Sequence, residues 1–250
     1  MKRNLFSFVF LLISLLSFST MAKAQVNAAN PFDEVGATHN KVLSEFFNEY
    51  SKDKVVEAQM SEKDLYSYVC NKATLGNCDE IVQMASGEIM QATKDMSLSE
   101  TADYLQAKGI VGPQFTAYVS KLDRILVQYG AAGNDVLHRA IAAVEGAILA
   151  DAGLKDTERQ SLLSATSVAR YSSAFWGDLN KGVTSYAGLS NVNLSAANLS
   201  RIVRADIRGA IRGFWEAWRR GLNPIKGAKA GAIIYSIIEA VAIIWEWIFG

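Results

Sequence analysis

The chain has 250 residues, a formal net charge of zero, two cysteines and two histidines. Half of its residues are hydrophobic, so it is long and apolar enough to bury a core in one or two domains. With only two histidines, a histidine-based active site is poorly supported, and two cysteines allow one intramolecular disulfide at most.

The first 24 residues have the pattern of a secretory signal peptide. Lys2 and Arg3 precede an apolar run from Leu5 to Phe18, and a small-x-small cleavage site ends at Ala24. The apolar run is short for a membrane span. We therefore expect a secreted or periplasmic protein cleaved near Ala24, with an uncleaved N-terminal anchor as the alternative.

Segments of helical periodicity follow one another along the body, and strand-like alternation is nearly absent. Ser61 and Ser97 open two helices in capping-box patterns, and Pro113 suits the first position of another. The expected helices are Asn40 to about Ser51, one from Ser61, Asp79 to about Lys94, Ser97 to Gly109, Pro113 to about Val127, Asn134 to about Leu154 and Asp156 to about Leu179. The sequence therefore predicts an all-α, bundle-like body.

Cys70 and Cys78 are the two cysteines, and both lie in the body. In an oxidising compartment, a pair this close in sequence is typical of a disulfide. The alternative is two buried free thiols.

The common catalytic motifs are absent from the sequence: H-E-x-x-H, C-x-x-C, G-x-S-x-G, G-x-G-x-x-G and the P-loop. Ser51 to Lys54 fits S-x-x-K without its partner motifs, and Asp135 with His138 is a single i, i+3 pair of metal-ligand types. We expect no enzymatic activity, no cofactor and no metal, with a hydrolase as a remote alternative.

Charge divides the chain into an acidic body and a basic tail. Residues Gln25 to Ser200 hold 14 basic and 21 acidic residues, a net charge of −7, whereas Arg201 to Gly250 hold 8 basic and 4 acidic, a net charge of +4. Residues 182–200 carry no charge and are rich in Gly, Ser and Asn, which is typical of a linker.

This division predicts three parts after the signal peptide: a body over 25–181 that folds alone, a linker over 182–200 and a C-terminal helical hairpin over 201–250. The first hairpin helix should begin near Asn198 or Ser200. It should end at Gly221, because Gly caps a helix and Pro224 cannot continue it.

The first tail helix carries three stripes. Small residues recur at every fourth position and would let another helix approach closely; they are Ala205, Gly209, Gly213, Ala217 and Gly221. Arginines beside tryptophans on an apolar arc are typical of helices that lie in a membrane interface. With the two tryptophans of the second helix, the expected membrane-binding residues are Arg204, Arg208, Arg212, Trp215, Trp218, Arg219, Trp245 and Trp247. The alternative is that the apolar arc packs into the core of the protein itself.

The second tail helix, Ala230 to Phe249, would be about 30 Å long. Glu239 near its centre opposes insertion, so the segment is no dependable membrane anchor. Glu239 and Glu246 share a face and could pair with the arginines if the hairpin folds back.

Two segments carry a resemblance to known proteins. The stretch "NPFDEVGATHNKVL" resembles the mature N-terminus of a group of uncharacterised secreted bacterial proteins, written N-P-x-x-x-V-G-x-x-H-N-x-x-L, to which no activity is assigned. The matching positions are Asn30, Pro31, Val35, Gly36, His39, Asn40 and Leu43. The residues themselves place Asn40 at a helix start, as a cap. The tail is similar in composition to glycine-zipper, bacteriocin-like peptides that act on membranes, and departs from them in its many arginines and two glutamates.

These observations favour a secreted, non-enzymatic protein whose C-terminal helices engage anionic membrane lipid, in a bacteriocin- or toxin-like role. The alternative is a periplasmic or surface interaction module whose C-terminal helices pack into its own core. A partner helix or a second copy of the chain could then dock on the small-residue stripe. We expect no nucleic-acid partner for an exported chain.

Overall fold

A computed structural model describes residues 26–50, 61–129, 134–182, 189 and 194–249. Its helices are α2 (Asp33–Glu49), α4 (Glu62–Lys72), α5 (Cys78–Met84), α6 (Glu88–Ala92), α7 (Leu98–Ala107), α8 (Pro113–Tyr129), α9 (Asn134–Ala150), α10 (Asp156–Asn180), α11 (Ala196–Arg219) and α12 (Pro224–Phe249). The described residues contain no strand, so the predicted all-α fold is confirmed. The predicted signal peptide and the stretch Ser51 to Lys54 lie outside the described residues.

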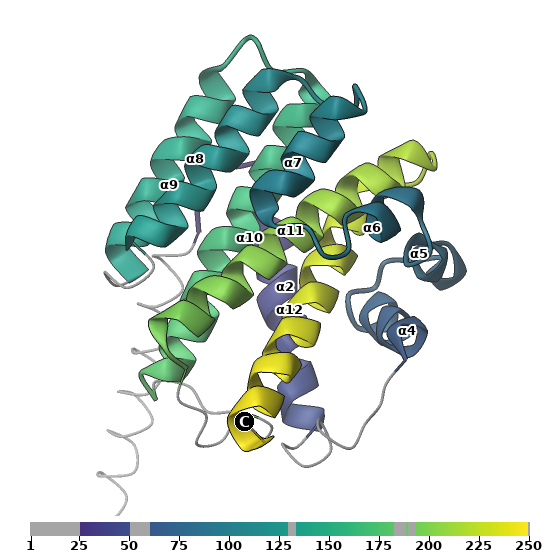
Figure 1. Ribbon diagram of the computed structural model, residues 1–250, viewed down its shortest axis with the longest axis vertical. Coiled ribbons are helices and arrows are strands. Elements are labelled where there is room, and N and C mark those ends of the chain that lie inside the picture. Colours follow the sequence, from purple (N-terminus) through teal and green to yellow (C-terminus); the bar gives the residue numbers. More distant parts are fainter. Residues whose placement is uncertain (1–25, 51–60, 130–133, 183–188, 190–193, 250) are drawn as a thin grey trace, which may run out of the picture.

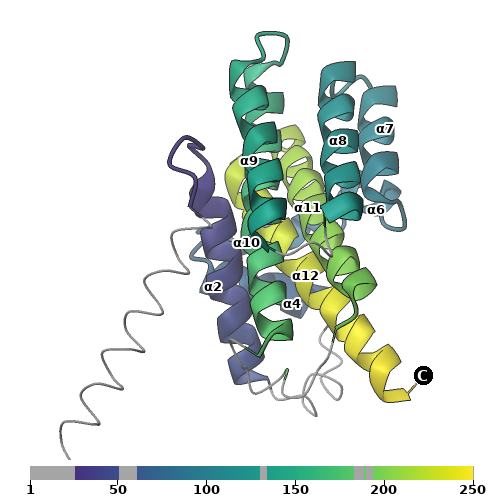
Figure 2. The ribbon, with the colours of Figure 1, turned by 90° about the vertical axis from the view of Figure 1, so that its left-hand side faces the viewer.

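Helix α10 is the centre of the molecule. It packs against α2, α9 and α11 and also contacts α8 and α12. In Figure 1 the pair α11 and α12 crosses in front of α10 and α2, while α7, α8 and α9 lie together at the top and α4 to α6 lie on the right. Figure 2 shows the C-terminal end of α12 extending below its neighbours. The predicted bundle-like body with a C-terminal hairpin is therefore present.

Several helix ends follow from local sequence. Ser97 and Glu100 form the predicted reciprocal capping box at the start of α7. Gly109 and Gly221 have positive φ angles of 69° and 70°, the left-handed conformation in which glycine ends a helix. Helix α11 begins earlier than expected, because Ser195 accepts a hydrogen bond from the backbone N–H of Asn198 and acts as the N-cap.

Two predicted elements need correction. Helix α2 begins at Asp33 and not near Asn40, since two acidic residues favour its first turn and Asn40 lies well inside it. The helix expected from Asp79 to Lys94 is two short helices, α5 and α6, separated at Gly87. The backbone N–H of Ile89 in the first turn of α6 donates to Glu216 of α11 at 2.9 Å, and a side chain at Gly87 would collide with the same glutamate, so a distant part of the chain holds the start of α6.

The body and the hairpin share one hydrophobic core. Buried residues of α2, α8 and α10 belong to the same cluster as those of α11 and α12. Trp176 of α10 and Trp215 of α11 are among its largest members, each 1% exposed. Within the expected linker, Leu189 and Leu194 are also buried, and residues 183–188 and 190–193 lie outside the described residues. The change in charge near residue 200 therefore does not mark separate cores.

Candidate functional site

The hairpin is held together by a close crossing of two helix backbones. Gly209 and Gly213 of α11 face Gly231 and Gly227 of α12, and a Cβ atom added to any of the four would lie less than 3.0 Å from backbone atoms of the facing glycine. Glycine is required here because no side chain fits between the helices. The small-residue stripe of α11 is therefore covered by α12 of the same chain, which leaves Gly209 and Gly213 no surface for a second copy.

The other members of the stripe have different places. Ala205 and Ala217 are buried in α11, and Ala217 lies beside Gly227. Gly221 follows the end of α11 and has nothing within 4 Å of an added Cβ. Its assignment to the packing stripe was wrong. Gly221 is four residues after Ala217, like the other members of the stripe, but the helix has already ended at Arg219, so Gly221 does not lie on the packed face.

Three arginines of α11 line a groove beside the hairpin. Arg201, Arg204 and Arg208 line a cavity of about 450 Å³, together with the start of α7, Asp123 of α8 and Glu239 of α12. Nε of Arg204 lies 2.8 Å from a carboxylate oxygen of Asp123, and Arg201 pairs with Glu239. We call this cavity the arginine groove. Glu246 also pairs with Arg201, so the charges of the two outer arginines are matched by carboxylates. Arg208 donates to the carbonyl oxygen of Met96 and has no carboxylate partner in the described part of the chain, so its guanidinium suits an anionic group.

The remaining arginines of the predicted membrane-binding set lie outside the groove. Arg212 is fully buried, donates to the carbonyl oxygen of Met90 and stacks on the ring of Tyr235, whose centroid is 4.4 Å away. Burial lowers the pKa of the Arg212 guanidinium. Arg219 is 40% exposed and pairs with Glu88 at 3.0 Å. Arg212 therefore cannot reach a ligand at the protein surface, whereas the Arg219 side chain is accessible there.

The predicted membrane-binding tryptophans also separate by exposure. Trp215 is buried against Phe115 and Phe214, whereas Trp218 is 47% and Trp245 is 50% exposed. The side chain of Trp247 lies outside the described residues. Two of the tryptophans are therefore available at the surface.

An apolar stripe follows the outer face of α12. Ile238 is 40% exposed, Val241 is partly exposed, and Trp245 continues the same face at i, i+3 and i+7 spacing. We call these three residues the α12 stripe. Arg201 lies beside it: its guanidinium pairs with Glu239 and, at 3.0 Å, with Glu246. The arginine groove and the α12 stripe thus share one charged edge.

Helix α12 is also the one described helix that is long and apolar enough to cross a membrane by length and composition. About 72% of its apolar window is buried inside the protein. Most of the hydrophobicity of α12 is therefore used in the core.

The N-terminal motif residues dock α2 on α10. The backbone N–H of Gly36 donates to Oγ of Ser167 at 3.0 Å, and the amide of Asn40 donates to the carbonyl oxygen of Tyr171 at 2.8 Å. His39 is fully buried, with Nε2 3.3 Å from a carboxylate oxygen of Asp206 in α11. Asn40 was expected to cap a helix, and it instead joins two helices.

A buried ionic cluster near this motif was not anticipated. The guanidinium of Arg170 in α10 pairs with Asp33 of α2 and with Glu145 of α9 at 3.1 Å. Asn30 donates to the same glutamate at 2.7 Å. The one sequence signal for it is an arginine within a long run of small and apolar residues in α10.

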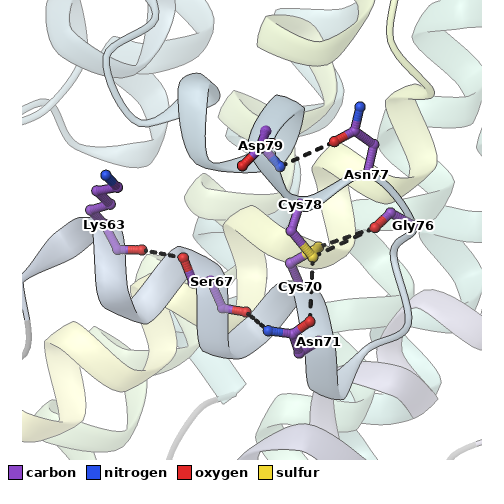
Figure 3. Close-up of a disulfide and its surroundings, with 8 residues drawn as sticks. All are labelled: Lys63, Ser67, Cys70, Asn71, Gly76, Asn77, Cys78 and Asp79. Atoms are coloured by element: carbon purple, nitrogen blue, oxygen red, sulfur yellow. Dashed lines mark hydrogen bonds between the residues drawn. A yellow bond between two sulfur atoms is a disulfide. The ribbon is translucent and has the colours of Figure 1, made fainter.

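The disulfide joins the end of α4 to the start of α5, as Figure 3 shows. Cys70 and Cys78 are bonded, with their Cα atoms 5.6 Å apart, and Gly76 turns the chain between them with a φ of 96°. The predicted pairing is confirmed, and the alternative of two free thiols does not describe this structure.

With this geometry established, comparison with known proteins adds no assignment. No protein-family model, no curated protein and no solved structure matches the chain. Function must therefore be argued from the site itself.

Proposed function

We propose that this protein is a non-enzymatic, exported protein that binds an anionic membrane surface through the outer side of its C-terminal hairpin. The arginine groove would receive a lipid phosphate, and the α12 stripe would rest against the acyl boundary. The observation that carries the proposal is the shared edge at Arg201, which sets the arginine groove next to exposed Ile238 and Trp245. A cationic site beside an apolar one matches the two halves of an anionic lipid.

The burial of the hairpin limits how this contact is made. Because Arg212 and Trp215 are buried in the core, lipid would be contacted by the groove and the stripe without unfolding the hairpin. The contact is therefore peripheral and does not require a pore. The two glutamates beside Arg201 weaken the attraction between the groove and an anionic lipid. Because salt screens this attraction further, binding should be strongest at low ionic strength.

The same burial supports an alternative function, a protein-interaction module whose tail is part of its own core. In that case the α12 stripe would contact a partner protein, and vesicles would not bind.

Vesicle binding tests the proposal. The parent should bind vesicles containing phosphatidylglycerol, with a blue shift of tryptophan emission, and should ignore phosphatidylcholine vesicles at the same low salt. Arg204→Gln with Arg208→Gln should reduce partitioning about 30-fold, at about 1 kcal/mol for each basic residue near the surface. Ile238→Ser with Trp245→Ser should also weaken binding, since it removes apolar contact.

Matched controls lie elsewhere on the surface. Arg139→Gln removes an exposed arginine of α9, and Val127→Ser removes a valine of α8 that is 65% exposed. Neither change should affect partitioning. Absence of binding by the parent, or equal losses in the control and the test variants, would reject the membrane function and favour the interaction module.

A further inference from the structure

The arginine groove has more hydrogen-bond donors than net charge. Its lining holds five charged side chains: the guanidinium groups of Arg201, Arg204 and Arg208, and the carboxylates of Asp123 and Glu239. Its volume of about 450 Å³ is in the range that is usual for small-molecule sites, about 300–1,000 Å³. The kind of anion that it receives therefore depends on which of these groups remain available.

Two of the three guanidinium groups are paired with carboxylates. Nε of Arg204 lies 2.8 Å from a carboxylate oxygen of Asp123. Arg201 pairs with Glu239 in the groove and, at 3.0 Å, with Glu246 beside it. The charges of these two arginines are therefore matched, and an anion that approaches them also meets their carboxylates.

Arg208 is the guanidinium of the groove that has no carboxylate partner among the described residues. Its Nη1 donates to the carbonyl oxygen of Met96, just before the start of α7, and its Nε is buried. The remaining nitrogen, Nη2, is not among the buried atoms and makes no hydrogen bond in the described part of the chain. Arg208 thus gives the groove one unmatched positive charge with an accessible donor.

The paired arginines keep free N–H groups as well. Asp123 lies at Nε of Arg204, and the partners of Arg201 lie at its Nε and Nη1. Both Nη nitrogens of Arg204 and Nη2 of Arg201 make no hydrogen bond among the described residues. These nitrogens can donate to oxygen atoms, although the charge of each guanidinium is already matched. The arrangement therefore fits a group with several acceptor oxygens and a single negative charge.

A phosphodiester has these properties. It carries one negative charge and presents four oxygens, whereas a carboxylate carries the same charge on two. A phosphomonoester carries almost two negative charges above its second pKa of about 6. In the groove its second charge would be unmatched and would be repelled by Asp123 and Glu239.

We propose that the arginine groove selects a phosphodiester monoanion over a phosphomonoester dianion, with Arg208 as the charged donor and Asp123 as the residue that sets the selectivity. The inference rests on the proposed function, because it specifies the phosphate that the groove receives. Asp123 acts through Arg204, since it matches the charge of that guanidinium and leaves the Nη nitrogens free. Without this carboxylate charge, two guanidinium groups are unmatched, which suits a dianion.

Two soluble head groups test the selection at pH 8. Glycerophosphoglycerol is the phosphodiester head group of phosphatidylglycerol, and glycerol 3-phosphate is a phosphomonoester that is dianionic at this pH. Saturable shifts of the Arg204 and Arg208 side-chain N–H resonances in NMR titrations give their dissociation constants. The parent should bind the diester about tenfold more tightly than the monoester, and more tightly than acetate, because one unmatched charge separates the phosphates.

Charge-removing variants assign the selectivity to the carboxylates. Asp123→Asn keeps the size of the side chain and should move the ratio of the two dissociation constants about tenfold toward the monoester. Glu239→Gln should move it in the same direction by less, since Glu246 still pairs with Arg201. Asp79→Asn is the matched control, because it removes an exposed carboxylate of α5 that does not line the groove, and it should leave the ratio unchanged.

Several results would overturn the selection: no saturable shift in the parent, equal or tighter binding of the monoester or acetate, or an unchanged ratio in folded Asp123→Asn. If Asp123→Asn does not fold, Glu239→Gln decides by the same ratio.

Vesicles containing phosphatidylglycerol separate this inference from the membrane function. Binding of the soluble diester without binding of vesicles would support the selection, assign it to a free phosphodiester and reject the membrane function. Binding of vesicles without a response to either soluble compound would overturn the selection and leave the membrane function standing.

Discussion

At the scale of single residues, the tail arginines differ because each meets a different neighbour. Arg204 finds Asp123 across the groove, whereas Arg212 finds a backbone carbonyl and an aromatic face. They lie eight residues apart, which places them about 80° apart around the helix. The exposure of each arginine, on which the proposed lipid contact depends, follows from what packs above its side chain.

The glycines of the crossing should be sensitive to one added methyl group. Gly213→Ala places Cβ against backbone atoms of Gly227, so the helices must separate, and we expect a loss of about 1–3 kcal/mol in the free energy of unfolding. Gly146→Ala is the matched control, because that glycine lies in α9 with nothing within 4 Å of the added atom. The control should gain about 0.5–1 kcal/mol from helix propensity. Urea denaturation measures both, and a stabilising Gly213→Ala would contradict the close crossing.

His138 should make stability depend on pH. Its pKa in the folded protein lies below the ordinary value of 6.5 because of burial and the neighbouring Arg170, with Lys181 acting in the same direction and Asp135 opposing them. The unfolded chain therefore takes up a proton at a higher pH, and this contribution to stability is lost as the pH falls below about 6.5. The free energy of unfolding should thus fall more steeply with acidification in the parent than in His138→Gln. Parallel curves from about pH 7.5 to about pH 5.5 would show that His138 does not titrate differently in the two states.

At the scale of elements, the α11–α12 turn and the α4–α5 turn are stabilised by different interactions. The α11–α12 turn depends on Gly221 at the helix end and on two pairs of facing glycines along the crossing. The α4–α5 turn is too small to bury much surface by itself and has a covalent bond instead. Contacts of α12 with α4 then connect the two elements.

The disulfide should contribute measurably to stability. Replacing both Cys70 and Cys78 with alanine should cost about 2–3 kcal/mol, the loop-closure entropy expected for a short loop. Thiol labelling of the denatured, unreduced protein should find no free thiol. The double variant should have the same urea denaturation curve with and without reductant. This control separates loss of the disulfide from other effects of the reductant. Two labelled thiols in the unreduced parent would remove this prediction.

At the scale of the whole molecule, the tail completes the core of the body. Asp206 of α11 lies against His39 of α2 and accepts from Oγ of Ser172 in α10 at 2.5 Å. Glu216 accepts from the backbone N–H of Ile89 at 2.9 Å and so holds the start of α6. Carboxylates of α11 therefore accept hydrogen bonds from α10 and α6, and these donors would be left unpaired without it.

Truncation after Lys181 tests this dependence. The sequence alone predicted that the body folds by itself, whereas the shared core leads us to expect that it does not. The truncated chain loses the partners of His39 and Ser172 and exposes the faces of α2 and α10 that contact the hairpin. We expect a helical product that lacks a cooperative thermal transition and has a weak near-ultraviolet circular dichroism signal. Adding the separate segment 182–250 should restore part of the transition. A sharp transition in the truncated chain alone would show that the body folds by itself.

Local patterns in the sequence determined much of the secondary structure. The capping box at Ser97, the stops at Gly109 and Gly221, and the pairing of Cys70 with Cys78 all depend on neighbours within about ten residues. The break at Gly87 and the early start of α2 were missed. The first depends on Glu216, which is 129 residues away along the chain, and no local pattern indicates such a contact.

Only the tertiary structure decided which stripe of α11 is inside. Helical periodicity gives the angles between the arginine, apolar and small-residue stripes, but it does not say how many sides of the helix are covered. Helix α11 contacts α10, α12, α6, α7 and α8, so it is surrounded and even Arg212 on the charged stripe is buried. The sequence determined that the tail is an amphipathic hairpin with a close-packed seam of small residues. Long-range packing determined that its seam and most of its apolar surface belong to the core, because the helices that cover α11 come from distant parts of the chain.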